Sequence, residues 1–468
     1  MRYLPKSPAE RQSMLAAIGA KSINDLFSCI PERYRLRDAL KLPGPLSESE
    51  IIDYFKARAA ENSGGYTSFL GAGVYNHLRS VVTDAIIQRG EFLTSYTPYQ
   101  AEIAQGTLQA IFEFQTLMCQ LTGQEVANAS MYDGSTATTE AVLMAERVTG
   151  RQRVLVARSV HPEYRDVLKT YAKNSGLRVE EIPYAPNGML DEKTLKSALK
   201  DDVACVVVQS PNFFGTIEPV AALAESVHPS GGLLVVTITE GVSLGLVRPP
   251  AEADIVAMEA QSFALPPSYG GPFAGVIASR EKFVRQMPGR LAGQTTDSEG
   301  HRGFVLTLAT REQHIRREKA TSNICTNQAL CALAATVHLT LLGKEGLREM
   351  AHHNLSKAQF ALGELEKIPG VRRAFSAPFF NEFTIELPRS AKLVNAHLLR
   401  EKIIGPFVLG TPYPELTKHA LVCVTETTPR VEIERFAAAL RKALEQLLDK
   451  DSPVGAQHVA SSQASDKR

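Results

Sequence analysis

The stretch 131–150, MYDGSTATTEAVLMAERVTG, combines small and hydroxyl-bearing residues with the beginning of an expected helix. Gly134, Ser135 and Thr136 stand just ahead of an apolar pattern that has the helical period. Exposed main-chain N–H groups, hydroxyl groups and the positive end of a helix would together suit a phosphate group. The same residues would also suit a simple helix cap, so both interpretations stay open.

A second stretch, 94–106 (TSYTPYQAEIAQG), places polar aromatic residues beside a proline turn. Its candidate site residues are Tyr96, Tyr99, Gln100 and Glu102. Aromatic side chains that carry a polar group line pockets, and they are also common at subunit interfaces. The stretch therefore predicts either the wall of a site or an ordinary interface loop.

A third stretch, 317–330 (REKATSNICTNQAL), gathers charged and amide side chains ahead of an expected long helix. In a two-domain enzyme, a loop at this place often reaches into the site and carries functional residues. Asn323 is the candidate here. Helix capping and interdomain hydrogen bonds would explain the same residues, so the role of this loop also stays open.

The elements that must position these residues follow an alternation of strands and helices. Between about residues 153 and 260, short apolar segments of strand length alternate with segments of helical pattern. Such an alternation is typical of an α/β fold with a mostly parallel sheet that is covered by helices on both faces. We therefore expect a large α/β domain built around this part of the chain.

The ends of the chain have different patterns. Ser7 with Glu10 and Ser47 with Glu50 match the capping-box signature, which predicts short helices near the N-terminus. Arms of this kind often wrap a partner subunit. We expect four regions: a helical N-terminal arm (1–65), a large α/β domain (66–330), a small C-terminal α+β domain (331–450) and a polar, disordered tail (451–468).

Composition excludes several classes of function. The 51 Lys and Arg residues balance 50 Asp and Glu residues, which leaves no electrostatic signature of nucleic-acid or membrane binding. Charges near the N-terminus argue against a secretory signal, and polar residues interrupt the apolar run 329–343, so no membrane span is expected. The six cysteines are scattered without zinc-binding spacing. We expect a cytoplasmic protein with reduced thiols and no metal site.

Several stretches together resemble the P-protein family of the glycine cleavage system, the aminomethyl-transferring glycine decarboxylases. Within that family the chain is similar to the first, or alpha, subunit of the forms that are split in two. The matching stretches are 2–5, 22–36, 95–106, 114–141 and 317–330. The resemblance implies a large domain of the aspartate-aminotransferase type, fold type I of the enzymes that use pyridoxal phosphate (PLP), with a seven-stranded sheet.

The resemblance also exposes a missing lysine. In the catalytic subunit of the family, a lysine just before a glycine-rich turn forms a Schiff base with PLP. When Phe263 and Pro272 are matched to that segment, the lysine falls on Gln261. A carboxamide nitrogen is not basic and cannot condense with an aldehyde. No neighbour replaces it, because Lys200 and Lys282 are successive lysines.

The acid that holds the pyridine nitrogen aligns near Glu240, whose side chain is longer than the usual aspartate. Glu240 would then be a remnant of the cofactor site, although an ordinary loop carboxylate explains it as well. The resemblance therefore implies that this chain binds no covalent cofactor and that PLP belongs to a beta subunit.

What the resemblance implies about function is a shared reaction. The alpha and beta subunits, expected as an α2β2 heterotetramer, would decarboxylate glycine and transfer the aminomethyl group to the lipoyl arm of H-protein. This chain would complete the site wall, with Tyr96, Tyr99, Gln100, Glu102, Ser135, Thr136 and Asn323 as candidates. Two alternatives stay open: a purely structural scaffold with a vestigial pocket, and a stand-alone PLP-dependent aminotransferase or decarboxylase that uses another lysine.

Overall fold

The structure is a computed structural model that describes residues 6–36, 38–62 and 64–449. The chain separates into two compact units, Met1–Gly64 and Gly65–Arg468. The tail predicted at 451–468 lies outside the described residues. The limits of the four expected regions stay a prediction. The packing near the limits at 65/66 and 330/331 is described below.

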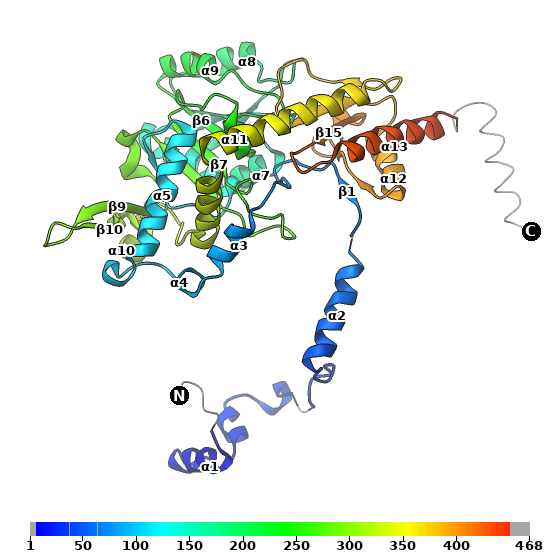
Figure 1. Cartoon of the computed structure of the whole chain (residues 1–468). Helices are drawn as coiled ribbons and strands as arrows, with labels where there is room; N and C mark the ends of the chain where they lie inside the picture. Colours follow the sequence, from blue (N-terminus) through cyan, green and yellow to red (C-terminus); the bar gives the residue numbers. More distant parts are fainter. Residues whose placement is uncertain (1–5, 37, 63, 450–468) are drawn as a thin grey trace, which may run out of the picture. The chain divides into compact units, whose positions relative to one another are not determined.

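Unit 1 consists of short helices (Figure 1): α1 (Pro8–Ala17), the 3-10 helices η1 (Ile23–Phe27) and η2 (Glu32–Tyr34), and α2 (Glu48–Ala60). Both predicted capping boxes form. The Ser7 hydroxyl accepts a hydrogen bond from the Glu10 N–H at 3.2 Å, and the Glu10 carboxylate accepts one from the Ser7 N–H at 2.8 Å. Ser47 and Glu50 repeat this pair. The helices therefore begin where their caps predict.

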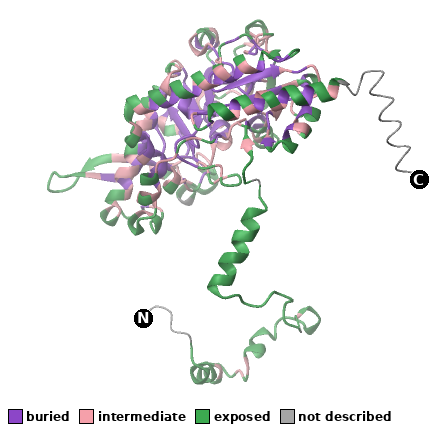
Figure 2. Cartoon of the chain, turned by 45° about the vertical axis from the view of Figure 1, so that its right-hand side comes forward, coloured by how far each residue is buried: buried purple, intermediate pink, exposed green. Residues whose placement is uncertain are grey.

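None of the described residues of unit 1 is buried, as the green ribbon of Figure 2 shows. Large apolar side chains remain exposed on it, among them Met14, Ile18, Phe27, Ile51 and Phe55. Unit 1 therefore contains no hydrophobic core among its described residues. A segment of this kind gains its stability from what it packs against.

Unit 2 is built on a seven-stranded sheet with the strand order β2-β8-β7-β6-β5-β3-β4. All neighbouring pairs from β7 to β4 are parallel, whereas β8 runs antiparallel to β7 and to β2. The strands are β2 (Val126–Ala127), β3 (Arg153–Ala157), β4 (Arg178–Ile182), β5 (Val203–Gln209), β6 (Leu233–Ile238), β7 (Ile255–Glu259) and β8 (Gly275–Ser279). Every residue of β5, β6 and β7 is buried, because both faces of the sheet are covered.

Helices and a hairpin surround this sheet. α6 packs against β5, β6, β7 and β8, and α5 packs against β2 and α11. The helices are α3 (Val81–Ile87), α4 (Gly90–Leu93), α5 (Gln105–Thr122), α6 (Gly134–Thr149), α7 (Pro162–Ala172), α8 (Glu192–Ala198), α9 (Val220–Val227) and α10 (Gln313–Arg316). The 3-10 turns are η3 (Ala101–Ile103), η4 (His228–Ser230), η5 (Gly241–Gly245), η6 (Glu281–Gln286), η7 (Ala309–Arg311) and η8 (Arg317–Lys319). The hairpin is β9 (Leu291–Thr296) with β10 (Arg302–Thr307).

The second core belongs to a smaller sheet of the order β11-β12-β15-β14. Its elements are β11 (Arg372–Arg373), β12 (Glu382–Glu386), α12 (Ala391–Arg400), β13 (Ile403–Ile404), β14 (Phe407–Val408), η9 (Pro414–Leu416), β15 (His419–Cys423) and α13 (Arg430–Asp449). The short strand β1 (Thr67–Ser68) pairs in parallel with β13, and Phe69 stacks on Phe436 at 4.3 Å. Residues 67–69, expected in the large domain, thus pack with the small one.

Helix α11 (Ala329–Leu365) connects the two cores and is broken at Gly343, where φ is 60°. Its residues up to Ala351 pack in the core of the large sheet, and those from Ala358 pack in the small one. The domain limit expected at 330/331 therefore lies at the beginning of α11, ahead of the point where the cores meet. By length and composition alone α11 could cross a membrane, and its burial in both cores accounts for the same apolar character.

Candidate functional site

Gln261 lies in the loop that follows β7, and its side chain is only 1% exposed. Its Oε1 accepts a hydrogen bond from the Tyr75 N–H at 2.9 Å, and its Nε2 donates to the Tyr75 carbonyl at 2.8 Å. The same Nε2 donates to the Leu265 carbonyl at 2.6 Å. A carboxamide can accept and donate at once, whereas a lysine ammonium only donates. Gln261 thus fastens the segment around Tyr75 to the loop after β7.

Glu240 follows β6, and its carboxylate is fully paired inside the protein. Its Oε2 accepts hydrogen bonds from His77 Nε2 at 2.9 Å and from Asn381 Nδ2 at 2.8 Å. Burial by itself lowers the pKa of His77, but the carboxylates of Glu240 and Glu426 outweigh it and raise that pKa to about 10. His77 is therefore a cation that bridges the buried carboxylate of Glu240 and the half-buried carboxylate of Glu426, with Nδ1 at 2.8 Å from Glu426 Oε2.

Glu259, the last residue of β7, places its carboxyl group at the N-terminus of α6. The oxygens accept hydrogen bonds from the main-chain N–H groups of Gly134 at 2.8 Å, Gln261 at 3.0 Å and Ala274 at 3.1 Å. The N-terminus of a helix is the part that attracts an acidic group or an anion. The chain therefore fills with its own side chain the place where the sequence suggested a phosphate.

The hydroxyl groups of Ser135 and Thr136 serve the helix cap. The carboxylate of Asp133 accepts hydrogen bonds from the Ser135 hydroxyl at 2.7 Å and from the Thr136 N–H at 2.8 Å. The Thr136 hydroxyl donates to the Asp133 carbonyl at 3.0 Å. Of the two interpretations that the sequence left open, these contacts match the cap.

Residues 69–78 carry two buried aromatic side chains, Phe69 and Tyr75, between exposed and half-buried residues. The Tyr75 hydroxyl donates to Glu382 Oε2 at 2.8 Å, and the Ala72 N–H donates to Glu382 Oε1 at 2.6 Å. Burial raises the pKa of Glu382 to about 7, although these hydrogen bonds lower it. Sequence reasoning missed Tyr75, His77, Glu259 and Glu382, because each acts through partners that are distant in the chain.

The candidates from the other two stretches lie on the surface. Tyr96 is 84% exposed and Tyr99 is 58% exposed, and the exposed set also includes Gln100, Glu102 and Asn323. The two stretches meet, because Arg290 donates both to the Tyr99 hydroxyl and to the Cys325 carbonyl. The structure therefore places Gln261 and Glu240 in the interior, Ser135 and Thr136 half-buried at the cap of α6, and the other candidates on the surface around Tyr99.

Comparison with known proteins decides the family. The model of the family described as "Glycine cleavage system P-protein" matches residues 1–440 of this chain. The chain belongs to this P-protein family. The resemblance inferred from the sequence is confirmed, and with it, at the level of the family, the expectation of an enzyme subunit.

Two relatives illustrate the match to the P-protein family. The probable glycine dehydrogenase (decarboxylating) subunit 1 of Koribacter versatilis (strain Ellin345) is 57% identical over 439 residues, which cover 93% of this chain and 99% of the relative. The protein of the same name from Geobacillus kaustophilus (strain HTA426) is 53% identical over 443 residues, which cover 94% and 98% of the two chains.

Solved structures confirm the predicted fold. A crystal structure of glycine decarboxylase (P-protein) in inhibitor-bound form matches with a TM-score of 0.86 and 42% identity, covering 95% of this chain and 100% of that one. The sphingosine-1-phosphate lyase of Burkholderia pseudomallei K96243 matches with a TM-score of 0.63 and 19% identity over 92% and 97% of the two chains, a likeness of fold alone. The expected fold type I of PLP enzymes is thus confirmed.

The residues of this P-protein chain do not fit pyridoxal phosphate. The cofactor needs an amine, an acid for its ring nitrogen and a binding place for its phosphate. Gln261, where the resemblance predicts the amine, is bonded to main-chain groups, and Glu240, where it predicts the acid, is paired with the cation of His77. The carboxyl group of Glu259 lies on the helix N-terminus. All three places are taken by side chains of the chain itself.

Another pattern on the chain has a structural role. Residues 241–245 read Gly-Val-Ser-Leu-Gly, which matches the GxSxG pattern of hydrolases. Ser243 is buried, and its hydroxyl donates to the Glu240 carbonyl at 2.7 Å. A hydroxyl held in the core by a main-chain carbonyl is not presented to a substrate, so this match does not indicate a hydrolase.

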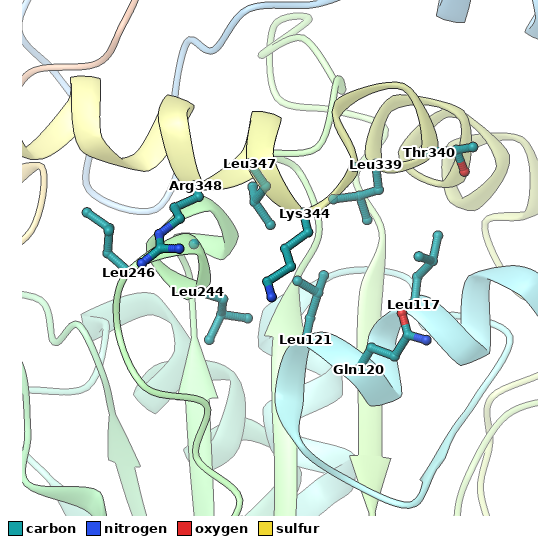
Figure 3. Close-up of a pocket in the computed structure, with 12 residues that line it drawn as sticks. Leu117, Gln120, Leu121, Leu244, Leu246, Leu339, Thr340, Lys344, Leu347 and Arg348 are labelled. Atoms are coloured by element: carbon teal, nitrogen blue, oxygen red, sulfur yellow. The ribbon is translucent and has the colours of Figure 1, made fainter.

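A cavity of about 780 Å³ lies between α5, η5 and α11, and Figure 3 shows residues that line it. Leucine side chains from the three elements form its walls, and Lys344 and Arg348 enter it from α11 beside the break at Gly343. None of the predicted site residues lines this cavity. The cavity is therefore separate from the predicted remnant of the cofactor site.

The buried carboxyl groups predict how stability depends on pH. Burial raises the pKa of Glu259 to about 8 and that of Glu218 and Glu382 to about 7. In the unfolded chain these groups titrate near 4.5, so the folded state holds extra protons above that pH. The contribution of these carboxyl groups to the free energy of unfolding is fully present below the unfolded pKa and is lost as the pH rises toward 8.

We therefore expect the free energy of unfolding to fall by at least about 1 kcal/mol between pH 5.5 and 8.5. Denaturant titrations at several pH values measure this slope. Glu259→Gln removes one titrating group and should flatten the slope, whereas Glu225→Gln, on an exposed part of α9, should not. An identical slope in wild type and Glu259→Gln would contradict the raised pKa of Glu259.

Proposed function

We propose that this chain is the subunit of a two-subunit glycine decarboxylase that does not anchor the cofactor. The observation that carries the proposal is Gln261, whose carboxamide stands at the aligned lysine position and is bonded to main-chain groups on both sides. A carboxamide cannot form a Schiff base. Residues 201–281 contain no lysine that could replace it. A second, beta, subunit then has to supply the amine and hold PLP.

In the assembled enzyme, glycine loses its carboxylate as CO2, with PLP on the second subunit as the electron sink. The remaining aminomethyl group passes to one sulfur of the lipoyl disulfide of H-protein, and that disulfide is reduced. The contribution of this chain is positioning and charge stabilisation at the edge of the partner's site. The residues that we place there are Tyr96, Tyr99, Gln100, Glu102 and Asn323.

The surface around these residues supports an interface. Large apolar side chains remain exposed on α3, on α4, on the loop after α4 and on η3: Val81, Val82, Leu93, Tyr96, Tyr99 and Ile103. A gathering of exposed apolar side chains marks an interaction surface more often than a free surface. The beta subunit is the partner that we assign to it, and pairing of two such αβ units gives α2β2. The cytoplasm is the compartment that we propose for this assembly.

Unit 1 is proposed to be the arm that embraces the beta subunit. It has exposed apolar side chains and no buried residue among its described residues. Deleting residues 1–64 should therefore leave the free energy of unfolding of the rest of the chain within about 0.5 kcal/mol. The same deletion should weaken association with the beta subunit at least tenfold, because it removes apolar interface area.

Denaturant unfolding and analytical ultracentrifugation measure the two effects of the deletion. Met14→Ala, which truncates one exposed side chain of α1, is the milder control and should weaken association far less. An arm deletion that lowers the stability of the isolated chain by several kcal/mol would mean that the arm packs on its own body. Unchanged association would remove the proposed role of the arm.

The experiment that tests the proposed function is the exchange of labelled CO2 into the carboxylate of glycine. Separately purified subunits are assayed alone and mixed, with lipoylated H-protein present. We expect exchange above background only in the mixture. Full exchange by the beta subunit alone would contradict the proposal.

The scaffold alternative has one observation in its favour, because side chains fill the remnant of the cofactor site. A substitution at the surface distinguishes a scaffold from a chain that takes part in the partner's site. If Tyr99→Ala lowers the turnover of the mixture without weakening association, this chain takes part in the partner's site. If only association changes, the chain is a scaffold. A stand-alone PLP enzyme would require a borohydride-reducible chromophore in the isolated chain.

A further inference from the structure

A buried arginine that lies in none of the three candidate stretches connects two of them directly. Arg290 immediately precedes β9 and is 3% exposed. Its Nη2 donates to the Tyr99 hydroxyl at 3.1 Å and to the Cys325 carbonyl at 2.8 Å. Its Nη1 donates to Thr326 Oγ1 at 3.0 Å and to Asn327 Oδ1 at 3.2 Å. One guanidinium group therefore joins the stretch 94–106 to the stretch 317–330.

Ala129, just ahead of the stretch 131–150, and Tyr132, within it, contact the same group of residues. The Arg290 carbonyl accepts a hydrogen bond from the Ala129 N–H at 2.9 Å. Asn327 Nδ2 donates to the Ala129 carbonyl at 3.1 Å, and the Tyr132 hydroxyl accepts from the Cys325 N–H at 3.0 Å. The stretch 131–150 thus joins the stretch 317–330 through Tyr132 and Cys325, and the guanidinium of Arg290 joins the stretch 317–330 to the stretch 94–106.

Arg290 also determines how the exposed ring of Tyr99 is held. The guanidinium lies 5.5 Å from the ring centroid, in addition to its hydrogen bond with the hydroxyl. An aromatic ring at the surface that is held at its face and at its polar end keeps one orientation. The Glu312 carboxylate, 3.9 Å from Arg290 Nε, balances the buried charge.

We infer that Arg290 is a positioning residue of the assembled enzyme. It holds Tyr99 and the 325–327 loop in the arrangement in which they meet the beta subunit. The inference rests on the proposed function, because it assumes that this surface completes the partner's site. Lysine cannot replace Arg290, since one ammonium group cannot reach four acceptors in a planar fork.

The test uses the full-length two-subunit enzyme with Arg290→Met and Arg290→Lys, in the glycine–CO2 exchange assay at saturating beta subunit. Arg290→Met should lower kcat 10-fold to 100-fold, because groups that are out of position stabilise the transition state less. The KM for glycine should change less than threefold. Arg290→Lys should recover only a small part of the loss. Arg302→Met, at an exposed arginine of the neighbouring β10, is the matched control and should leave kcat unchanged.

Two further measurements separate positioning from a loss of folding. Millimolar methylguanidinium should restore part of the activity of Arg290→Gly, and methylurea, which has a similar shape but no charge, should not. In a double-mutant cycle, Tyr99→Phe should cost much less in the Arg290→Met background than in the wild type. These effects are not expected of a residue that only supports the fold.

The outcomes decide between the proposals. An unchanged kcat in Arg290→Met, or a loss that disappears when the beta subunit is raised to saturation, overturns the inference while the proposed function stands. If the wild-type mixture exchanges no more CO2 than the beta subunit alone, both the proposed function and the inference that rests on it fail.

Discussion

Replacing Gln261 by lysine is expected to lower the free energy of unfolding by about 2 to 4 kcal/mol without creating a site for pyridoxal phosphate. The substitution removes the acceptor for the Tyr75 N–H, which lies at 2.9 Å in the interior. It also introduces an ammonium group at a place that is 1% exposed. The carboxyl group of Glu259, two residues away, still lies on the helix N-terminus that a phosphate would need.

Denaturant unfolding measures the stability of the Gln261→Lys variant, and borohydride reduction after incubation with PLP detects a Schiff base. Gln261→Met is the uncharged control for the lost hydrogen bonds, and Gln88→Lys, at an exposed position, should change stability by less than about 0.5 kcal/mol. A reduced pyridoxyl adduct at position 261 would contradict our account of the occupied site.

Replacing His77 by leucine should destabilise the chain by about 3 to 5 kcal/mol, because it leaves the buried carboxylate of Glu240 and the half-buried one of Glu426 without their cation. His77 contacts Glu240 at 2.9 Å and Glu426 at 2.8 Å, and its side chain is 2% exposed. Its pKa of about 10 means that the ion pair is present at neutral pH. Its contribution to stability is complete below about pH 6.5 and is lost as the pH rises through about 10.

A matched histidine and a second substitution sharpen this prediction. His353→Leu, at an exposed histidine of α11, should cost less than about 0.5 kcal/mol. In the double variant His77→Leu with Glu240→Leu, one unpaired carboxylate is gone, so the combined loss should be smaller than the sum of the single losses. A loss below about 1 kcal/mol in His77→Leu, measured by denaturant unfolding, would show that the carboxylates find other partners.

The sequence predicted those parts of the fold that have a local pattern. The apolar runs that became β5 and β6 are buried throughout, and the serine caps of α1 and α2 form as their spacing indicates. The hairpin of β9 and β10 was not predicted, because its exposed residues carry neither a strong apolar alternation nor a two-residue turn signal. Local sequence patterns therefore predicted the strands of the buried sheet better than the hairpin of β9 and β10.

The candidate site shows the limit of sequence reasoning more clearly. Gln261 and Glu240 could be singled out because a family pattern gives their positions a chemical meaning. Their partners Tyr75 and His77 are separated from them by 186 and 163 residues, so no periodicity connects them. Arg290 is likewise 191 residues from Tyr99. Pairings of this length depend on the tertiary fold.

The lack of a core in unit 1 has a consequence for the cell. A segment without buried residues of its own remains open to proteases until another surface covers it. Under the proposed assembly, copies of this chain made in excess of the beta subunit would thus be cut at the arm first. Degradation of unassembled copies would keep the amounts of the two gene products in balance.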